Sequence, residues 1–379
     1  MIYLDNAATT PVRREALEAM WPYLTNDFGN PSSAHDMGAS AARGLDAARR
    51  AVAAVAGCRA SDIIFTSGGT EADNLAIKGI ALASTRGRHL VTTRIEHDAV
   101  LESVDYLVRV HGFEASFVPT DATGLVDPAE LAAAVRPDTA LVTIQYANNE
   151  IGTVQPISEL AAVAHAAGAP FHTDAVQAAG WLPLAGLGVD ALSLSGHKVG
   201  APKGSGVAIV RGRTPLEPLV HGGGQERGRR SGTENVAGAV ALATALTLAE
   251  AEREDAAARV STLRDVIIER VLAALPDARL TGHPSLRLPG TASFVFASTS
   301  GEAVLLELER VGIVCSSGSA CAAGSDEPSH VLTALGLSRE LAQTAVRLTL
   351  GTGASAEEID RTAASLIAAV ETVTGIGRN

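Results

Sequence analysis

Length, composition and charge set the first limits on this chain. Its 379 residues exceed what one hydrophobic core usually supports, which predicts two domains, or one large domain with an appendage. A formal net charge of −12 repels nucleic acid and anionic membranes, so neither is an expected partner. No apolar run is long enough to span a membrane, and the N-terminal MIYLDNAATTP lacks a secretory signal, so the cytoplasm is the expected location.

Seven short β-rich runs alternate with helical patterns between residues 63 and 210. In chain order they are IIFT, HLVTT, EASFVPT, ALVTIQYA, PFHTDA, ALSLS and GVAIV. Strands separated by helices are typical of a largely parallel sheet with helices on both faces. The sequence therefore predicts an α/β fold with a seven-stranded, mainly parallel sheet.

Two of the intervening helices have recognisable starts. Asp127 can cap a helix in which Pro128 takes the first position. Thr70 and Asp73 resemble a capping box, which predicts a helix beginning just after the SGG of residues 67–69.

A long alanine- and charge-rich segment follows, from Ala237 to Leu275. It predicts one or two helices that end at Pro276 and connect two domains. Strand-like ASFVFAS, helix-like EAVLLELERVG, strand-like AVRLTLG and a last helix from Ala356 then form an α+β tail. The predicted division is a large domain of residues 15–252 and a smaller α+β domain of residues 1–14 and 253–379.

Polar residues follow most of the predicted strands, where ligands of parallel sheets gather. They are Ser67 to Thr70, Glu96 and His97, Asn148 and Asn149, Asp174 and Gln177, and Ser195 to Lys198. A glycine turn that begins a helix can bind phosphate, a lysine amine can form an imine, and a buried carboxylate can pair with a pyridinium nitrogen. Alone, each feature has an ordinary structural explanation; together they match pyridoxal phosphate, with Lys198 as the amine and Asp174 as the carboxylate.

These segments also carry a family resemblance. YLDNAATTP, FTSGGTEADNLAI, NNEIGTVQPI, HTDAVQ, SLSGHKVGAPKGSG, RRSGTEN and SSGSACAAGSDEPSHVL resemble the cysteine desulfurases, a group within the class V aminotransferase superfamily of fold-type I pyridoxal-phosphate enzymes. The match runs from residue 3 to about residue 360, and SSGSAC is typical of the desulfurases with the longer cysteine loop. The resemblance places the pyridoxal phosphate in the large domain and the cysteine loop in the small one.

The resemblance implies a role for each matching residue. Lys198 would bind the cofactor covalently, and His97 would stack on its ring and move protons. Asn149 would lie near the ring hydroxyl and the substrate carboxylate, which Arg347 would clamp. The remaining cofactor contacts would be Gly69, Thr70, Ser195 and His197 for the phosphate, Asp174 and Gln177 for the ring, and Thr233 for the phosphate of a neighbouring subunit in a homodimer.

Cys321 separates a desulfurase from an aminotransferase. It lies among small residues, where packing does not explain a cysteine, and it would take sulfur from L-cysteine as a persulfide, leaving L-alanine. The expected acceptor is a protein, either an iron–sulfur scaffold or a thiolation relay. Cys321 is the one residue that could contact a transient iron–sulfur cluster, and otherwise no metal is expected. A selenocysteine lyase, or another class V enzyme, is the alternative.

Overall fold

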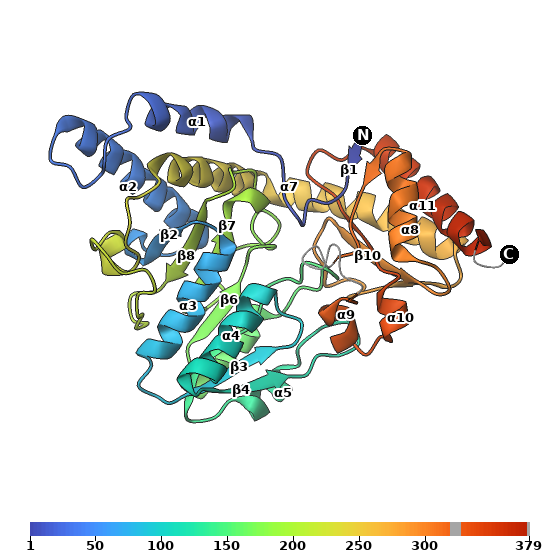
Figure 1. Cartoon of the computed structure of the whole chain (residues 1–379), viewed down its shortest axis with the longest axis horizontal. Helices are drawn as coiled ribbons and strands as arrows, with labels where there is room; N and C mark the ends of the chain where they lie inside the picture. Colours follow the sequence, from blue (N-terminus) through green and yellow to red (C-terminus); the bar gives the residue numbers. More distant parts are fainter. Residues whose placement is uncertain (319–326, 377–379) are drawn as a thin grey trace.

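The computed structural model describes residues 1–318 and 327–376 (Figure 1). Its central feature is a seven-stranded sheet with the strand order β2-β8-β7-β6-β5-β3-β4. Strand β8 runs antiparallel to β7 and β2, and the other pairings are parallel. The predicted α/β class and mainly parallel sheet are confirmed. The strands are β2 (Ile63–Thr66), β3 (His89–Thr93), β4 (Glu114–Val118), β5 (Thr139–Thr143), β6 (Phe171–Asp174), β7 (Ala191–Ser195) and β8 (Gly206–Val210).

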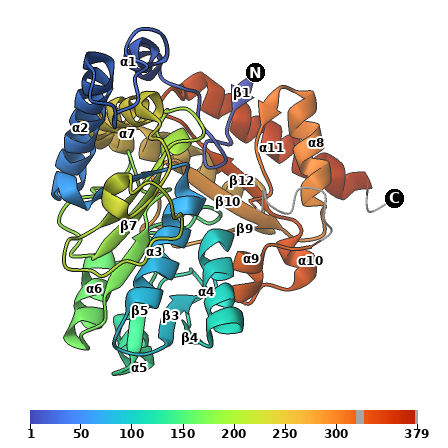
Figure 2. The ribbon, with the colours of Figure 1, turned by 60° about the vertical axis from the view of Figure 1, so that its left-hand side comes forward.

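Both faces of this sheet are covered because successive strand residues point to opposite sides. In β2, Ile63 and Phe65 enter one apolar core, and Ile64 enters the core on the other face. Helices α3 (Gly69–Ala83) and α4 (Asp98–His111) pack side by side over the second face (Figure 2). The first face is covered by α2 (Asp36–Ala56), α5 (Pro128–Ala134), α6 (Ile157–Ala166) and the first part of α7 (Val236–Ala274).

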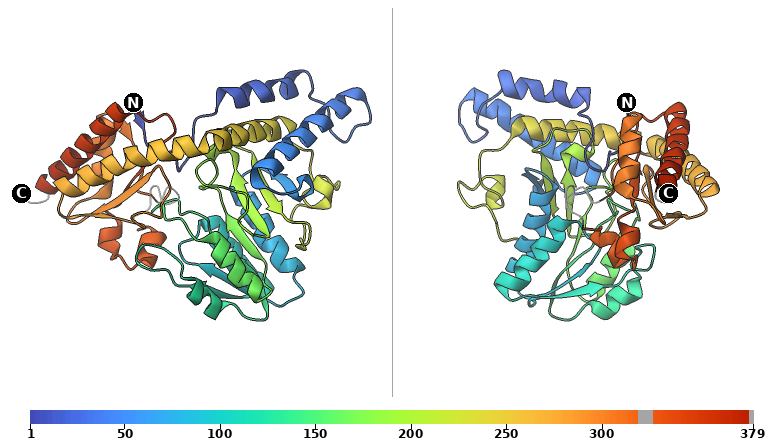
Figure 3. Two further views of the ribbon diagram at one scale, coloured as in Figure 1. Left: turned by 180° about the vertical axis from the view of Figure 1, so that it is seen from behind. Right: turned by 45° about the vertical axis from the view of Figure 1, so that its right-hand side comes forward.

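The segment predicted as one or two helices is a single helix, α7, of 39 residues. Its first part packs on α1 (Arg14–Thr25) and α2, and its second part packs on α11 (Ala356–Ile376), β9 (Ala278–Leu280) and β10 (Thr291–Phe296). Figure 3 shows α7 running from one side of the molecule to the other. Helix α7 therefore joins two separate apolar cores, with buried residues up to Ala249 in one and Val260 onward in the other.

The second core lies between small sheets and the C-terminal helices. The antiparallel sheet has the order β12-β10-β9, with β12 at Val346–Thr349, and β1 (Ile2–Tyr3) pairs in parallel with β11 (Ile313–Val314). The other elements are the helices α8 (Gly301–Arg310), α9 (His330–Ala334) and α10 (Arg339–Ala342) and the short 3-10 turns η1 (Ala60–Asp62), η2 (Gly196–Lys198) and η3 (Glu226–Gly228). The boundaries at residues 14/15 and 252/253 stay a prediction, which the separation of the cores along α7 supports.

The helix starts were predicted with mixed success. Asp127 caps α5 as expected, since its carboxylate accepts the backbone N–H of Ala129 at 2.8 Å. The capping box of Thr70 and Asp73 is wrong, because α3 begins at Gly69 and places both residues inside the helix. The carboxylate of Glu71 accepts the Ser67 N–H at 2.8 Å instead.

Across the ranges that the structure describes, no helix is both long and apolar enough to cross a membrane.

Candidate active site

A cavity of about 630 Å³ lies at the carboxyl ends of the parallel strands. Thr233 lines a separate cavity of about 190 Å³, and Cys321 lies outside the described residues. The main cavity brings together ten of the sequence-predicted site residues, namely Gly69, Thr70, His97, Asn149, Asp174, Gln177, Ser195, His197, Lys198 and Arg347. Residues that are far apart in the sequence therefore share one site.

The amino end of α3 forms the predicted phosphate-binding part of the cavity. A Cβ atom on Gly69 would lie 2.8 Å from Cγ2 of Val176 and 3.3 Å from Cβ of Ser195, so a larger residue would push these side chains away. The backbone N–H groups of the first turn and the positive end of the helix dipole suit an anion. The Thr70 side chain does not cap α3, so helix capping does not account for a threonine at this position.

His197 contributes a neutral imidazole beside this end. Its Nδ1 lies 3.1 Å from the hydroxyl oxygen of Thr9, and its backbone oxygen accepts a hydrogen bond from the hydroxyl of Thr10 at 2.9 Å. Burial lowers the pKa of His197 to about 4, and the charge of Lys198 acts in the same direction. His197 can therefore offer a phosphate an N–H group, but no positive charge at neutral pH.

Asp174 ends β6 and is buried under the cavity. One carboxylate oxygen, Oδ1, accepts the Val176 N–H at 2.9 Å. Burial raises the pKa of Asp174, and the charges of His97 and Lys198 oppose that rise. A protonated pyridine nitrogen above this carboxyl would supply the missing positive charge and keep it ionised.

Two further buried acids and a histidine lie near Asp174. Burial raises the pKa of Glu96 to about 8 and, with the charge of Asp174, raises the pKa of Asp73. Burial lowers the pKa of His172 to about 3, and its ring nitrogens contact the hydroxyls of Thr143 at 2.8 Å and Ser193 at 2.9 Å. His172 is thus a neutral packing residue, as the sequence indicated, and cannot neutralise Asp73.

Lys198 lies at the end of η2, directly after β7. Its Nζ donates hydrogen bonds to the carbonyl oxygens of Ala7 and Ala8, the latter at 2.8 Å. The Nε2 of Gln177 donates to the same Ala7 oxygen at 3.0 Å. The N-terminal segment therefore holds both of these cofactor-binding candidates at the wall of the cavity.

His97 combines a structural task with a place in the cavity. Its Nδ1 accepts the backbone N–H of Ala99 at 3.1 Å, so the imidazole caps α4. A ring nitrogen that accepts a hydrogen bond carries no proton, which assigns the proton of the neutral ring to Nε2. With Nδ1 held in this way, Nε2 can donate a hydrogen bond into the cavity, and the ring can take up a further proton only when Nδ1 releases the Ala99 N–H.

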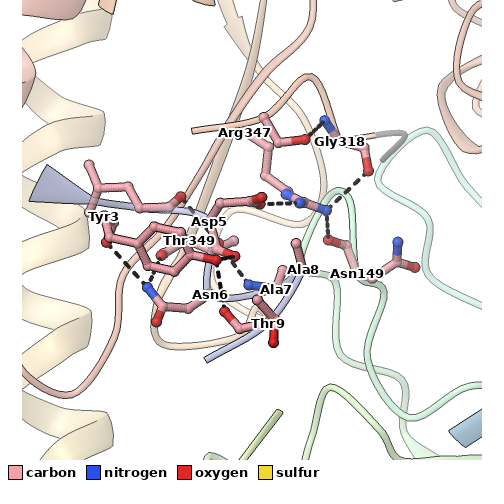
Figure 4. A network of polar contacts seen from close by, with 12 residues as sticks. Tyr3, Asp5, Asn6, Ala7, Ala8, Thr9, Asn149, Gly318, Arg347 and Thr349 are labelled. Carbon is pink, nitrogen blue, oxygen red and sulfur yellow. Dashed lines mark hydrogen bonds and ion pairs between the residues drawn. The ribbon is translucent and has the colours of Figure 1, made fainter. Parts of the chain in front are cut away.

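The guanidinium group of Arg347 has three hydrogen-bonded partners among the described residues at the other end of the cavity (Figure 4). Its Nη1 donates to the carbonyl oxygens of Asn149 at 2.8 Å and Gly318 at 3.0 Å, and its Nη2 contacts Oδ1 of Asp5 at 2.7 Å. The side chain is 2% exposed, and Nε has no partner within the described residues. The neighbouring Asn148 holds the turn, as the sequence indicated, because its Oδ1 accepts the N–H groups of Glu150 and Ile151 at 2.8 and 2.9 Å.

The two cysteines with a described environment are poor nucleophiles. Burial raises the pKa of Cys58 to about 11 and that of Cys315 to about 12. Both thiols stay protonated near neutrality, and a thiol must lose its proton before it attacks sulfur. Neither residue competes with Cys321 for the role that the sequence assigned to it.

Four residues of the site escaped the sequence reasoning. Asp5 pairs with Arg347, the Ser329 hydroxyl donates to Oε2 of Glu150, and Nε2 of His330 lies 2.9 Å from the Glu96 carbonyl oxygen. Glu150, Ser329 and His330 also line the cavity. All four residues lie within the motifs YLDNAATTP, NNEIG and EPSH, but these motifs do not indicate which side chains contact one another.

The residues present fit pyridoxal phosphate. A helix amino end that excludes a Cβ suits the phosphate, a buried carboxyl in need of a cation suits the ring nitrogen, and a lysine lines the same cavity. In the described ranges 1–318 and 327–376, no cluster of three or more His, Cys, Asp or Glu is arranged to hold a metal ion.

Comparisons with known proteins agree with this chemistry. A cysteine desulfurase IscS from Dictyoglomus turgidum is 47% identical over 364 residues, which cover 95% of this chain and 92% of that protein. A solved NifS-like protein superimposes with a TM-score of 0.90 at 38% identity, covering 98% of this chain and 99% of its own. SspA, solved in complex with cysteine, gives 0.81 at 37% identity over 92% and 99% of the two chains. The family model "Aminotransferase class-V" matches residues 2–362, and the chain belongs to that family.

Proposed function

We propose that this protein is a pyridoxal-phosphate-dependent cysteine desulfurase that uses Cys321 as its sulfur carrier. L-Cysteine and the Cys321 thiol become L-alanine and a Cys321 persulfide. The observation that carries the proposal is the single cavity lined by Lys198, Asp174, His97 and Arg347, in a chain 47% identical to a cysteine desulfurase over 95% of its length. The relative solved with bound cysteine supports the choice of substrate.

The large sheet would hold the cofactor. Gly69, Thr70, Ser195 and His197 would surround its phosphate, and Asp174 and Gln177 would contact its ring. Lys198 would bind its aldehyde carbon through Nζ. When bound, the cofactor supplies an electron sink that stabilises negative charge at the α-carbon of the substrate.

Arg347 and Asn149 would orient the amino acid. A guanidinium pairs with a carboxylate in a plane, which fixes the α-carbon relative to Lys198 better than a point charge would. The Lys198 amine would take the α-proton of the bound amino acid at Nζ. For His97 to carry a proton, its Nδ1 would release the Ala99 N–H and become protonated, and the imidazolium could then deliver a proton from Nε2.

The Cys321 thiolate would attack the sulfur atom of the substrate. A sulfur–sulfur bond forms, the carbon–sulfur bond breaks, and its electron pair stays with the carbon, which then takes up a proton and leaves as L-alanine. Among the three cysteines this role falls to Cys321, because the pKa values of Cys58 and Cys315 lie at about 11 and 12. The persulfide would pass to an acceptor protein for iron–sulfur assembly or for thiolation, and we place this exchange in the cytoplasm.

The test of this proposal is a matched pair of cysteine variants. Cys321→Ser should abolish L-alanine and sulfide formation from L-cysteine but leave the visible absorption of the bound cofactor unchanged. Cys315→Ser should retain activity. Mass mapping after incubation with L-cysteine should find a gain of one sulfur on the peptide that contains Cys321. Full sulfide output from Cys321→Ser would refute the persulfide step.

We further propose that the active protein is a homodimer. Leu17, Trp21, Leu24 and Phe28 form an exposed apolar group on and just after α1, and their exposed fractions reach 65% at Trp21. A second copy covering this surface would remove it from water. Thr233 lies away from the main cavity of its own chain, which leaves it available to the phosphate site of the partner.

Mixed dimers test the shared site. Lys198→Ala and Thr233→Ala homodimers should both be impaired, whereas a mixed dimer holds one site with Lys198 from one subunit and Thr233 from the other. Refolding the two variants together should restore up to half of the activity per dimer. No rescue, with dimers confirmed by ultracentrifugation, would show that Thr233 acts within its own subunit or not at all.

A further inference from the structure

Asp5 is placed where the substrate carboxylate is expected to bind. Its Oδ1 lies 2.7 Å from Nη2 of Arg347, and the side chains are 18% and 2% exposed. Asp5 follows β1, and Arg347 belongs to β12, so the pair joins the two ends of the chain (Figure 4). A contact this buried is more than a surface ion pair.

The backbone around Asp5 is fixed on both sides. Asp5 forms an isolated parallel bridge with Thr349, and the Thr349 N–H donates to the Leu4 carbonyl oxygen at 2.7 Å. The Asn6 side chain donates to the Thr349 oxygen at 2.7 Å, and the Tyr3 hydroxyl donates to the Asp5 carbonyl oxygen at 3.0 Å. The backbone of Asp5 is therefore fixed next to β12, and only the short side chain has to be ordered for its carboxylate to meet Arg347.

The charges at Arg347 are already balanced. Asp5 neutralises the guanidinium, and the Asn149 and Gly318 carbonyl oxygens take up both N–H groups of Nη1. The donors left for an incoming α-carboxylate are Nε, which has no partner within the described residues, and the second N–H of Nη2 beside Asp5. The carboxylate therefore brings a second negative charge next to Asp5 on one buried cation. Its affinity for Arg347 is lower than it would be for an unpaired arginine.

We propose that Asp5 is an internal competitor that sets the affinity of Arg347 for α-carboxylates. The inference rests on the proposed function, in which Arg347 binds the carboxylate of both L-cysteine and L-alanine. Substrate and product share this carboxylate, so binding it more tightly would stabilise both equally and slow the exchange of one for the other. Asp5 is thus a positioning residue that weakens binding and favours product release.

The isosteric variant Asp5→Asn tests this role in the full-length enzyme loaded with cofactor. Asparagine keeps an oxygen for Nη2 but removes the charge. The Kd of L-alanine, measured by titration calorimetry, should fall about 3- to 10-fold, with a parallel fall in KM for L-cysteine. Ethylamine, which is L-alanine without its carboxylate, should bind both proteins equally. An unchanged or higher Kd for L-alanine, or an equal change for ethylamine, would overturn the proposal.

A second pair of variants shows whether Asp5 acts through Arg347. In an Arg347→Gln background, Asp5→Asn should no longer change the Kd of L-alanine, whereas an equal change there would refute the coupling. If Asp5→Asn unfolds, Asp5→Ser provides the same comparison. The readout is binding, so it is independent of turnover. An enzyme that released no sulfide but showed the shift in L-alanine affinity would refute the proposed function and retain the role of Asp5.

Discussion

The two ends of the active-site cavity are built in different ways. At the proposed cofactor end, Asp174 and Ser195 are the last residues of two strands of one sheet, and Gly69 and Lys198 lie just after strands of the same sheet. At the substrate end, Arg347 meets Asp5, Asn149 and Gly318, which come from three segments that are distant in the sequence. The first end needs one sheet to form, and the second needs the whole chain.

This difference predicts how the two ends respond to mutation. Cofactor-end side chains project from a scaffold that its apolar cores already stabilise, so their loss should affect chemistry more than stability. Arg347 contributes hydrogen bonds that tie the N-terminal segment and the residues around Gly318 to β12. Its replacement should affect both chemistry and stability.

The largest effect should come from Lys198→Ala. Without the amine, sulfide release should fall at least about 10³-fold, because no other lysine lines the cavity among the residues that the structure describes. The matched control is Lys203→Ala, an exposed lysine five positions further on, which should retain activity. Sulfide assays and the visible spectrum of the reconstituted protein measure the result. Activity within 10-fold of the parent would remove Lys198 from the mechanism.

Arg347→Lys should come next. It keeps the charge but loses the planar fork, so KM for L-cysteine should rise about 10- to 100-fold. Lost hydrogen bonds to Asp5 and to the Asn149 and Gly318 carbonyls should also lower the free energy of unfolding by about 1–3 kcal/mol. Urea unfolding of this variant beside Lys198→Ala measures the contrast. Equal stability of the two variants would contradict the division between the ends.

Gly69→Ala should have a smaller effect confined to the cofactor end. The added methyl group would stand 2.8 Å from Val176 and press on Ser195, which should weaken cofactor binding about 10-fold and cost about 1–3 kcal/mol of stability. Gly68→Ala is the matched control, because a Cβ at Gly68 meets no atom within 4 Å. Cofactor titration should separate the two variants. Equal Kd values would show that the α3 end does not contact the phosphate.

The smallest effect on activity is expected from Glu96, whose replacement should change the pH dependence of stability. Glu96 has a folded pKa of about 8, above the ordinary value of 4.5, so the folded state holds a proton that the unfolded state releases. Its contribution is fully present below pH 4.5 and is lost as the pH rises to about 8. Glu96→Gln should remove a slope of at most about 1.4 kcal/mol per pH unit in this window.

The Glu96 carboxyl accepts the Gln145 N–H at 2.9 Å and contacts the Thr93 hydroxyl at 2.6 Å. A glutamine side chain can keep both contacts, with its amide oxygen toward Gln145 and its amide nitrogen toward Thr93. Unfolding midpoints measured from pH 5 to 8 for the parent and Glu96→Gln provide the comparison. Parallel curves would mean that Glu96 is ionised in the folded protein.

The sequence predicted that the residues of the proposed cofactor end lie together, and they do line one cavity, because the signals for their strands are local. The runs IIFT, HLVTT, ALSLS and GVAIV coincide with β2, β3, β7 and β8, and parallel strands bring their carboxyl ends to one edge. The predicted capping box at Thr70 was wrong because a local motif does not fix the first residue of a helix. If a helix begins one residue earlier than expected, the residue predicted to cap it lies inside the helix. Only the folded structure shows that α3 begins at Gly69.

At the substrate end, the sequence indicated Arg347 but not the residues that contact it. Arg347 was assigned through the family resemblance, since by sequence alone it is an ordinary strand charge. Its pairing with Asp5 joins positions 342 residues apart, and no periodicity or spacing encodes such a contact. The same holds for Glu150 with Ser329 and for Glu96 with His330.

By itself, the sequence determined the layered α/β architecture and the sheet edge at which Lys198 and Asp174, the residues proposed to bind the cofactor, lie together. These follow from hydrophobic periodicity and from the residues that end each strand. Tertiary structure alone decided the charge balance of Arg347, the neutral state of His172 and the raised pKa of Glu96. The physical reason is that the burial of a side chain and its ion pairs depend on which distant segments exclude water from it. Those segments come together only when the chain folds.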